Sequence, residues 1–236
     1  MKHEGAAGAI PGKLKSVLYG KSMDSCSFFS ILCSLNNNCI FRGFMLTAFP
    51  PPGSTFQYSD INYMIVGHIA EKASGLSFEE FLKQNIFIPL EMVNTGTGYF
   101  PSENPQLAIG YGPEGNKLQE GLSCADMGYG AGSMYSTADD LYKWDRALYT
   151  EKLVSKQSLE AMFIRYHDTY GYGWWFSDTG RGFIPVHGGR LLNGTFSGFF
   201  IRNTIEDTCV IVLGNDGFHD EKRDFAMQVT DALMKK

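Results

Sequence analysis

The 236-residue chain lacks the features of a membrane-spanning or nucleic-acid-binding protein. No apolar run reaches the roughly 18 to 20 residues that cross a bilayer, and the nearest approach, 28–35, ends at three asparagines. The net charge is −5, and no basic stripe with interleaved aromatic residues is present. The first residues do not read as a signal peptide either. We therefore expect no transmembrane segment and no nucleic-acid partner.

Cysteine pairs with the spacing of a zinc site are also missing. The five cysteines include no CxxC pair, and three of them (Cys26, Cys33 and Cys39) have spacings that miss the usual tetrahedral patterns. The run 20–22 resembles the end of a phosphate-binding loop, but Lys15 stands where that loop requires glycine. Free buried thiols are the simpler interpretation. We expect neither a metal nor a cofactor.

The composition is that of a globular protein. Hydrophobic residues make up 44% and charged residues 19% of a chain long enough for one large domain or two modest ones. Residues 1–49 have no convincing period and form an atypical N-terminal segment. Residues 50–236 are patterned, with a mainly helical part at 50–169 and a sheet with a C-terminal helix at 170–236. This order predicts an α+β fold with an antiparallel sheet and covering helices.

Periodicity and end signals give the expected elements. Helices are predicted at 61–74, 77–88, after the cap at 136–139, and at 155–163. The strands are predicted at 172–176, 183–187, 195–201 and 208–213. A closing helix at about 220–233 is expected to turn Phe225, Val229 and Leu233 inward.

Tyr58 stands at the junction between a stiff loop and a helix. Three prolines at 50–52 and Gly53 exclude helix before it. Ser59 or Asp60 is the natural N-cap of the helix that follows. A phenol fixed at such a junction has two interpretations, chemistry or packing.

Two short motifs give the junction a chemical meaning. They are Tyr58-Ser59-Asp60 at a helix start and His187-Gly188-Gly189 at a strand end. In this order they resemble the second and third motifs of the serine β-lactamase and penicillin-binding protein superfamily, especially its class C-like and esterase-like branch. The resemblance extends over most of 51–233 and includes the runs 86–92, 130–141 and 212–215.

The resemblance implies roles for six residues. Tyr58 would be the base that activates a nucleophile, and His187 a donor beside tyrosine and substrate. Asp60, Gly188, Gly189 and Arg190 would contact a small-molecule or peptide substrate, with the amide of Arg190 as a candidate oxyanion donor. The phenol, with an ordinary pKa of about 10, would need nearby cations to act as a base at neutral pH.

The sequence departs from the family pattern at two places. No serine is followed at the third place by lysine, so the Ser-x-x-Lys nucleophile motif is absent. Asp60 replaces the usual asparagine, and an ionised carboxylate accepts hydrogen bonds but cannot donate them. Two functions therefore stay open: a serine hydrolase acting on esters, β-lactams or D-amino-acid peptides, and a catalytically inactive homologue that keeps the cleft as a binding or structural module.

The resemblance also bears on the compartment and the quaternary structure. Members of the family are often secreted or periplasmic, and no compartment is assigned to this chain. In the family, N-terminal strands pair with the last strand, here 208–213, and residues 1–49 show no such strands. We therefore expect an open sheet edge that residues 1–49 or a second copy of the chain would cover.

Overall fold

The computed structural model describes residues 53–98, 103–112, 115, 117, 129–167, 170–191, 195–216 and 218–235. The expectations for residues 1–49, including Cys26, Cys33 and Cys39, lie outside the described residues. In these ranges no helix has the length and apolarity needed to cross a bilayer. Cys209 is a free thiol.

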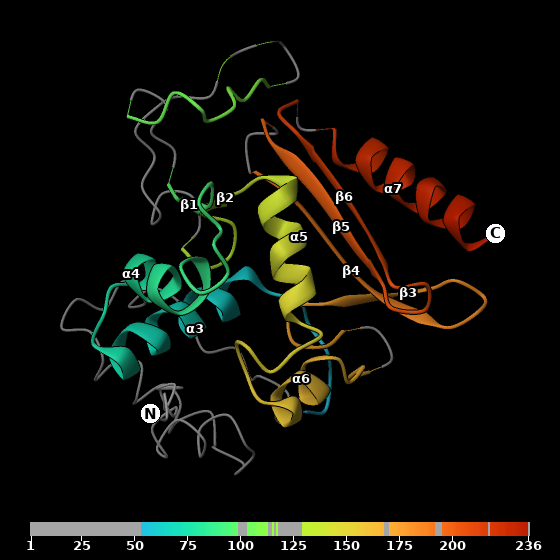
Figure 1. Ribbon diagram of the computed structural model, residues 1–236, viewed down its shortest axis with the longest axis horizontal. Coiled ribbons are helices and arrows are strands. Elements are labelled where there is room, and N and C mark those ends of the chain that lie inside the picture. Colours follow the sequence, from blue (N-terminus) through green and yellow to red (C-terminus); the bar gives the residue numbers. More distant parts are fainter. Residues whose placement is uncertain are drawn as a thin grey trace, which may run out of the picture.

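A four-stranded antiparallel sheet forms one half of the structure (Figure 1). Its order is β3 (Trp175–Asp178), β4 (Phe183–Arg190), β5 (Ser197–Asn203) and β6 (Thr208–Gly214). The predicted four-strand meander is thereby confirmed. The first strand begins later than expected, because Gly173 turns the chain with a φ of 82° just before it.

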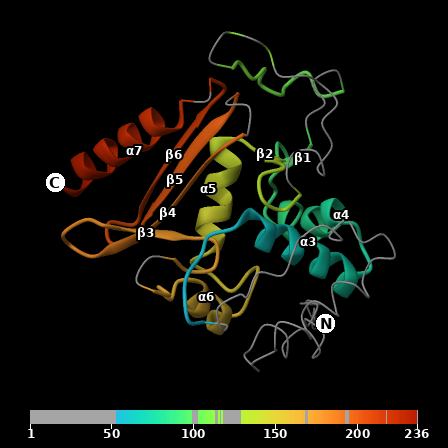
Figure 2. The same ribbon diagram turned by 180° about the vertical axis from the view of Figure 1, so that it is seen from behind.

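Helices cover the two faces of this sheet. Helix α7 (His219–Met234) packs on β5 and β6, and α5 (Ala138–Ala147) lies on the opposite side (Figures 1 and 2). Alternation along the strands supplies the core beneath α7. That core consists of Ile184, Val186, Phe199, Ile201, Val210 and Ala226.

The predicted inner face of α7 is partly wrong. Val229 and Leu233 pack against the core, but Phe225 is 58% exposed. Ala226 and Thr230 are fully buried instead, one helical turn apart. These small side chains allow the helix to approach the sheet, and the Thr230 hydroxyl is satisfied by the Ala226 carbonyl at 2.9 Å. The inner face is therefore centred one position beyond Phe225.

The helical half contains α3 (Asp60–Ser74), α4 (Phe78–Leu82) and α6 (Lys156–Met162). Ser77, Thr137 and Ser155 cap the helices that follow them, each accepting a backbone N–H from three residues on. The cap expected within 136–139 is thereby confirmed, with Thr137 as the capping residue. The helix expected at 77–88 changes after α4 into a π-helical turn, η1 (Lys83–Phe87). A two-stranded sheet of β1 (Gly96–Thr97) and β2 (Met134–Tyr135), not predicted from the sequence, lies beside it.

Candidate functional site

Tyr58 enters the site from the extended segment that precedes α3. Ser59 occupies the N-cap position with a φ of −153°, and Asp60 is the first helical residue. Of the two N-cap candidates, Ser59 is therefore confirmed and Asp60 is wrong. The Asp60 carboxylate instead accepts a hydrogen bond from the Tyr58 hydroxyl, and both side chains are exposed, Tyr58 by 41%.

Tyr58 belongs to a cluster of aromatic rings. It stacks on Trp175 with ring centroids 5.7 Å apart, and the edge of Tyr170 lies at the same distance. Phe56 packs against both partners at 5.3 and 5.7 Å. The Tyr170 hydroxyl is 2.7 Å from that of Tyr63 on α3. Sequence reasoning missed this cluster, although aromatic density at 170–176 was a signal for it.

His187 reaches the same cluster from β4. Its ring centroid lies 6.4 Å from that of Tyr170, and its strand partner is Phe200. Burial lowers the pKa of His187, and the charge of Asp60 only partly opposes this effect. The imidazole is therefore neutral near pH 7. Tyr58 and Asp60 at the start of α3 and the distant His187 on β4 are thus brought together around Tyr170.

The electrostatics at Tyr58 are opposite to those of a ready base. Burial, followed by the charge of Asp60 and its hydrogen bond, raises the pKa of Tyr58 to about 12. Burial and the bond with Tyr63 likewise raise the pKa of Tyr170. Both phenols are therefore protonated at neutral pH and each has an O–H able to donate a hydrogen bond. The catalytic roles expected of Tyr58 and His187 stay predictions.

The remaining site candidates lie along the end of β4. A side chain at Gly188 would point toward Phe199 and His219, on the α7 face of the sheet, where their atoms already fill the space. Gly189 shares the face of His187, because side-chain positions two apart on a strand point the same way, and it borders open space. Arg190 ends the strand, exposed and paired with Ser197. Gly189 and Arg190 are therefore the accessible members of this group.

Ser197, the serine that follows the third motif, does not face this cluster. Ser197 is buried, and its hydroxyl has no hydrogen-bond partner among the described residues. Ser197, Phe199 and Ile201 are two residues apart along β5 and therefore share one face of the strand. Because Phe199 and Ile201 belong to the core beneath α7, Ser197 points toward the α7 face rather than toward His187. Ser197 is therefore not placed to act as a nucleophile beside His187. No cluster of metal-ligating side chains occurs in the described ranges.

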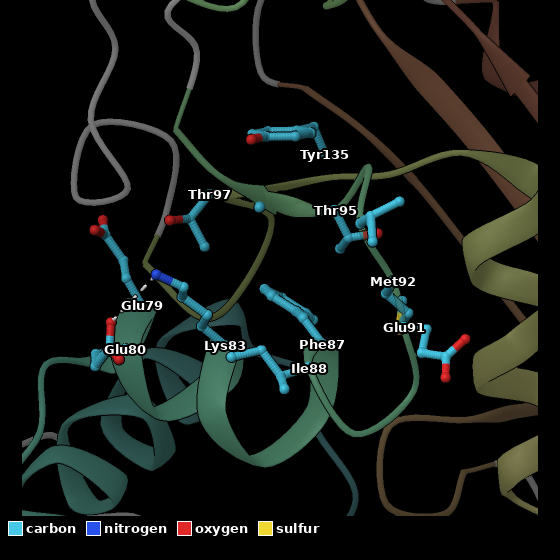
Figure 3. Close-up of a pocket in the computed structure, with 12 residues that line it drawn as sticks. Glu79, Glu80, Lys83, Phe87, Ile88, Glu91, Met92, Thr95, Thr97 and Tyr135 are labelled. Carbon is cyan, nitrogen blue, oxygen red and sulfur yellow. Dashed lines mark ion pairs between the residues drawn. The ribbon is translucent and has the colours of Figure 1, made fainter.

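A separate pocket of about 610 Å³ lies between α4, η1 and the small β1–β2 sheet (Figure 3). Phe87 and Tyr135 extend over its interior, and Lys83 at its rim pairs with Glu80 at 3.9 Å. Neither Tyr58 nor His187 lines it. Because neither motif contributes a residue to this pocket, we place the candidate site at the aromatic cluster instead.

The fold and the two motifs indicate a class of protein, and comparison with known proteins identifies the family. The Beta-lactamase family model matches residues 45–232, and the chain belongs to that family. The expected resemblance to the β-lactamase and penicillin-binding protein superfamily, and the expected α+β fold, are thereby confirmed.

Individual relatives are penicillin-binding proteins and a D-alanine hydrolase. A putative penicillin-binding protein of Bacillus subtilis is 34% identical over 70% of this chain and 41% of its own length. A teichoic acid D-alanine hydrolase of Staphylococcus aureus is 29% identical over 66% of this chain and 38% of its own. The octameric penicillin-binding protein homologue from Pyrococcus abyssi superposes with a TM-score of 0.66 at 27% identity, over 80% of this chain and 44% of that one. The chain thus spans about two fifths of the length of these relatives.

Proposed function

We propose that the chain is a serine-hydrolase-like protein whose Tyr58–His187 site recognises acyl compounds. The substrate class is that of esters, β-lactams or peptides of D-amino acids, as the names of its relatives suggest. The observation that carries the proposal is the meeting of Tyr58, Asp60 and His187 around Tyr170. Protonated Tyr58 and neutral His187 are both able to hydrogen-bond a substrate carbonyl or leaving group.

We further propose that this chain binds such compounds without forming an acyl-enzyme. Covalent catalysis requires an activated nucleophile, and no serine in the 236 residues stands in a Ser-x-x-Lys motif. The environment of Tyr58 keeps its phenol protonated rather than poised to take a proton. A binding role therefore fits these residues better than turnover.

The experiment combines a covalent probe with a binding measurement. Incubation with a fluorescent penicillin and with a fluorophosphonate, followed by intact mass, is expected to show no adduct, while reversible binding of the penicillin saturates. Tyr58→Phe and His187→Ala are expected to weaken that binding about tenfold or less for each lost hydrogen bond. Tyr142→Phe and His68→Ala, exposed residues on other surfaces, are the matched controls. Absence of saturable binding would contradict the recognition proposal.

Acyl transfer or hydrolysis is the second candidate function, and membership of the Beta-lactamase family favours it. The same incubation decides between the two. A mass increase on a serine, together with turnover of an ester, would establish a hydrolase with a nucleophile outside the usual motif and would reject binding without turnover.

We also propose that the outer edge of β6 is covered, either by residues 1–49 or by a second copy of the chain. In the described part of the chain β6 pairs with β5 alone. An unpaired strand edge is a template for association. The homologue from Pyrococcus abyssi is octameric, which is compatible with assembly in this fold.

A further inference from the structure

Helix α3 carries more large apolar side chains than the described part of the structure buries. There are five of them in its 15 residues: Ile61, Met64, Ile65, Val66 and Ile69. Ile61 and Val66 are 37% and 53% exposed, and Gly67 is the one buried residue of the helix. None of the five belongs to either hydrophobic core of the described residues. Because a helix that is apolar on most sides is normally buried, α3 is expected to have a further partner.

The uncovered side of α3 lies opposite Gly67. A Cβ at Gly67 would lie 2.9 Å from the ring of Tyr129 and 3.6 Å from that of Phe78 on α4, so this side of the helix is packed. Helix α4 lies beside α3 here (Figures 1 and 2). With 3.6 residues per turn, positions two residues away point nearly the opposite way, and these positions are Ile65 and Ile69. We call the surface of Ile61, Ile65, Val66 and Ile69 the outer face of α3.

The chain itself contains an apolar segment that could cover this face. Residues 28–35, with the sequence FFSILCSL, contain six apolar residues and no charged one. The described residues begin at Gly53, and Asp60 at the start of α3 follows Leu35 by 25 residues (60 − 35). A chain of that length reaches at most about 80–90 Å, whereas α3 is about 22 Å long. Every part of the outer face is therefore within reach of residues 28–35.

We propose that residues 28–35 dock on the outer face of α3 and bury its isoleucines. Removal of apolar surface from water favours this pairing, and the run brings no charge that would have to be desolvated. Covalent connection to α3 gives the segment a higher effective concentration than a separate molecule would have. This docking does not depend on acyl recognition by Tyr58 and His187. It leaves the other residues of 1–49, or a second copy of the chain, for the edge of β6.

Disulfide trapping on the full chain tests the docking, because Cys33 lies within the run. Ile61→Cys and Val66→Cys each place a thiol on the outer face, and Asp231→Cys, at an exposed position of α7, is the control. Two cysteines are bridged only when their Cα atoms come within about 7 Å. With oxidised glutathione, the thiols on α3 are expected to join Cys33 at least about tenfold faster than the control thiol does. Peptide mass mapping identifies the bonds.

A double-mutant cycle tests the same contact without a covalent bond. Leu32→Ala and Ile65→Ala are made singly and together, and urea unfolding gives the equilibrium constants. Side chains in contact have non-additive effects, so the double variant is expected to deviate from additivity at least about twofold. Phe225→Ala is the matched control, because Phe225 is an exposed apolar residue of α7. Its combination with Leu32→Ala is expected to be additive.

The position of the disulfide distinguishes the possible occupants of the outer face. Preferential bonding to Cys33 within one chain, together with a non-additive cycle, supports docking of residues 28–35. A disulfide that joins the introduced thiols of two chains would assign the face to a second copy and overturn the proposal. Bonding no faster than that of the control, or equally fast with Cys26, Cys33 and Cys39, would also overturn it. Additive effects of Leu32→Ala and Ile65→Ala would reject the contact even where a disulfide forms.

Discussion

Two neighbouring glycines of β4 have opposite surroundings. A Cβ at Gly188 would lie 2.3 Å from the ring of Phe199 and 2.7 Å from Nε2 of His219. A Cβ at Gly189 would meet nothing within 4 Å. Gly188 therefore lets two side chains close the α7 face beneath His187, and Gly189 leaves space on the candidate-site face. The same residue type serves packing at one position and access at the next.

Alanine substitutions distinguish these two roles. Gly188→Ala is expected to lower the free energy of unfolding by about 1–3 kcal/mol, because Phe199 and His219 must shift. Gly189→Ala is expected to change it by less than about 0.5 kcal/mol, as for a surface substitution. Urea denaturation of both variants measures the difference. Equal stability of the two variants would contradict the packing role assigned to Gly188.

For single residues, the sequence predicts the motif residues of the candidate site better than it predicts their neighbours in space. Tyr58 and His187 could be selected from their motifs, and they do approach one cluster. The rings around Tyr58, namely those of Tyr170 and Trp175, could not be, because they meet Tyr58 only through packing of the segment before α3 against the sheet. The face of the sheet toward which a side chain at Gly188 would point likewise depends on strand register.

A buried ion pair joins α5 to the sheet. Nε of Arg202 on β5 donates to Oδ1 of Asp145 on α5 at 2.6 Å, and the two side chains are 2% and 0% exposed. The guanidinium group also lies 4.7 Å from the ring centroid of Tyr149 and 4.9 Å from that of Phe163. Its charge is therefore compensated only by a small set of groups, of which Asp145 is the nearest anion.

Removal of Asp145 is expected to destabilise the fold strongly. Asp145→Ala leaves a buried guanidinium group without its partner, which costs about 3–5 kcal/mol. Asp207→Ala is the matched control, because Asp207 pairs with Arg146 at 2.7 Å but is 73% exposed, and such pairs contribute about 0–1 kcal/mol. Thermal or urea unfolding of the two variants gives the comparison. A loss at Asp145 no larger than that at Asp207 would show that the buried pair does not hold α5 on the sheet.

The elements themselves were largely predictable, but their charged contacts were not. The cap at Thr137 and the stripe containing Trp144 identify α5 from local sequence. Hydrophobic periodicity, however, assigns acids to solvent, so Asp140 and Asp145 were not expected inside. The π-helical turn η1 was also missed, because its five residues at the end of the helix are too few to define a period.

On the scale of the whole molecule, the sheet separates two kinds of surface. One face is closed by α7 over an apolar core, and the other carries His187 toward Tyr170 and the segment of Tyr58. The site is assembled where the helical half meets the edge strand β3 and its neighbour β4. The opposite edge, β6, is distant in strand order from this site. Association at β6 would therefore be compatible with an accessible Tyr58.

The covered-edge proposal makes a prediction for β6. In an antiparallel strand half of the backbone amides point away from the neighbour, here away from β5. If residues 1–49 or a second copy pair with β6, these outward amides should exchange with solvent as slowly as the inward ones. Hydrogen exchange read residue by residue on the full chain gives the rates, and light scattering gives the mass, with 26.2 kDa for one chain. Slow exchange in a monomer assigns the cover to residues 1–49, and slow exchange in a dimer assigns it to the second copy. Rapid exchange of the outward amides in a monomer would reject both.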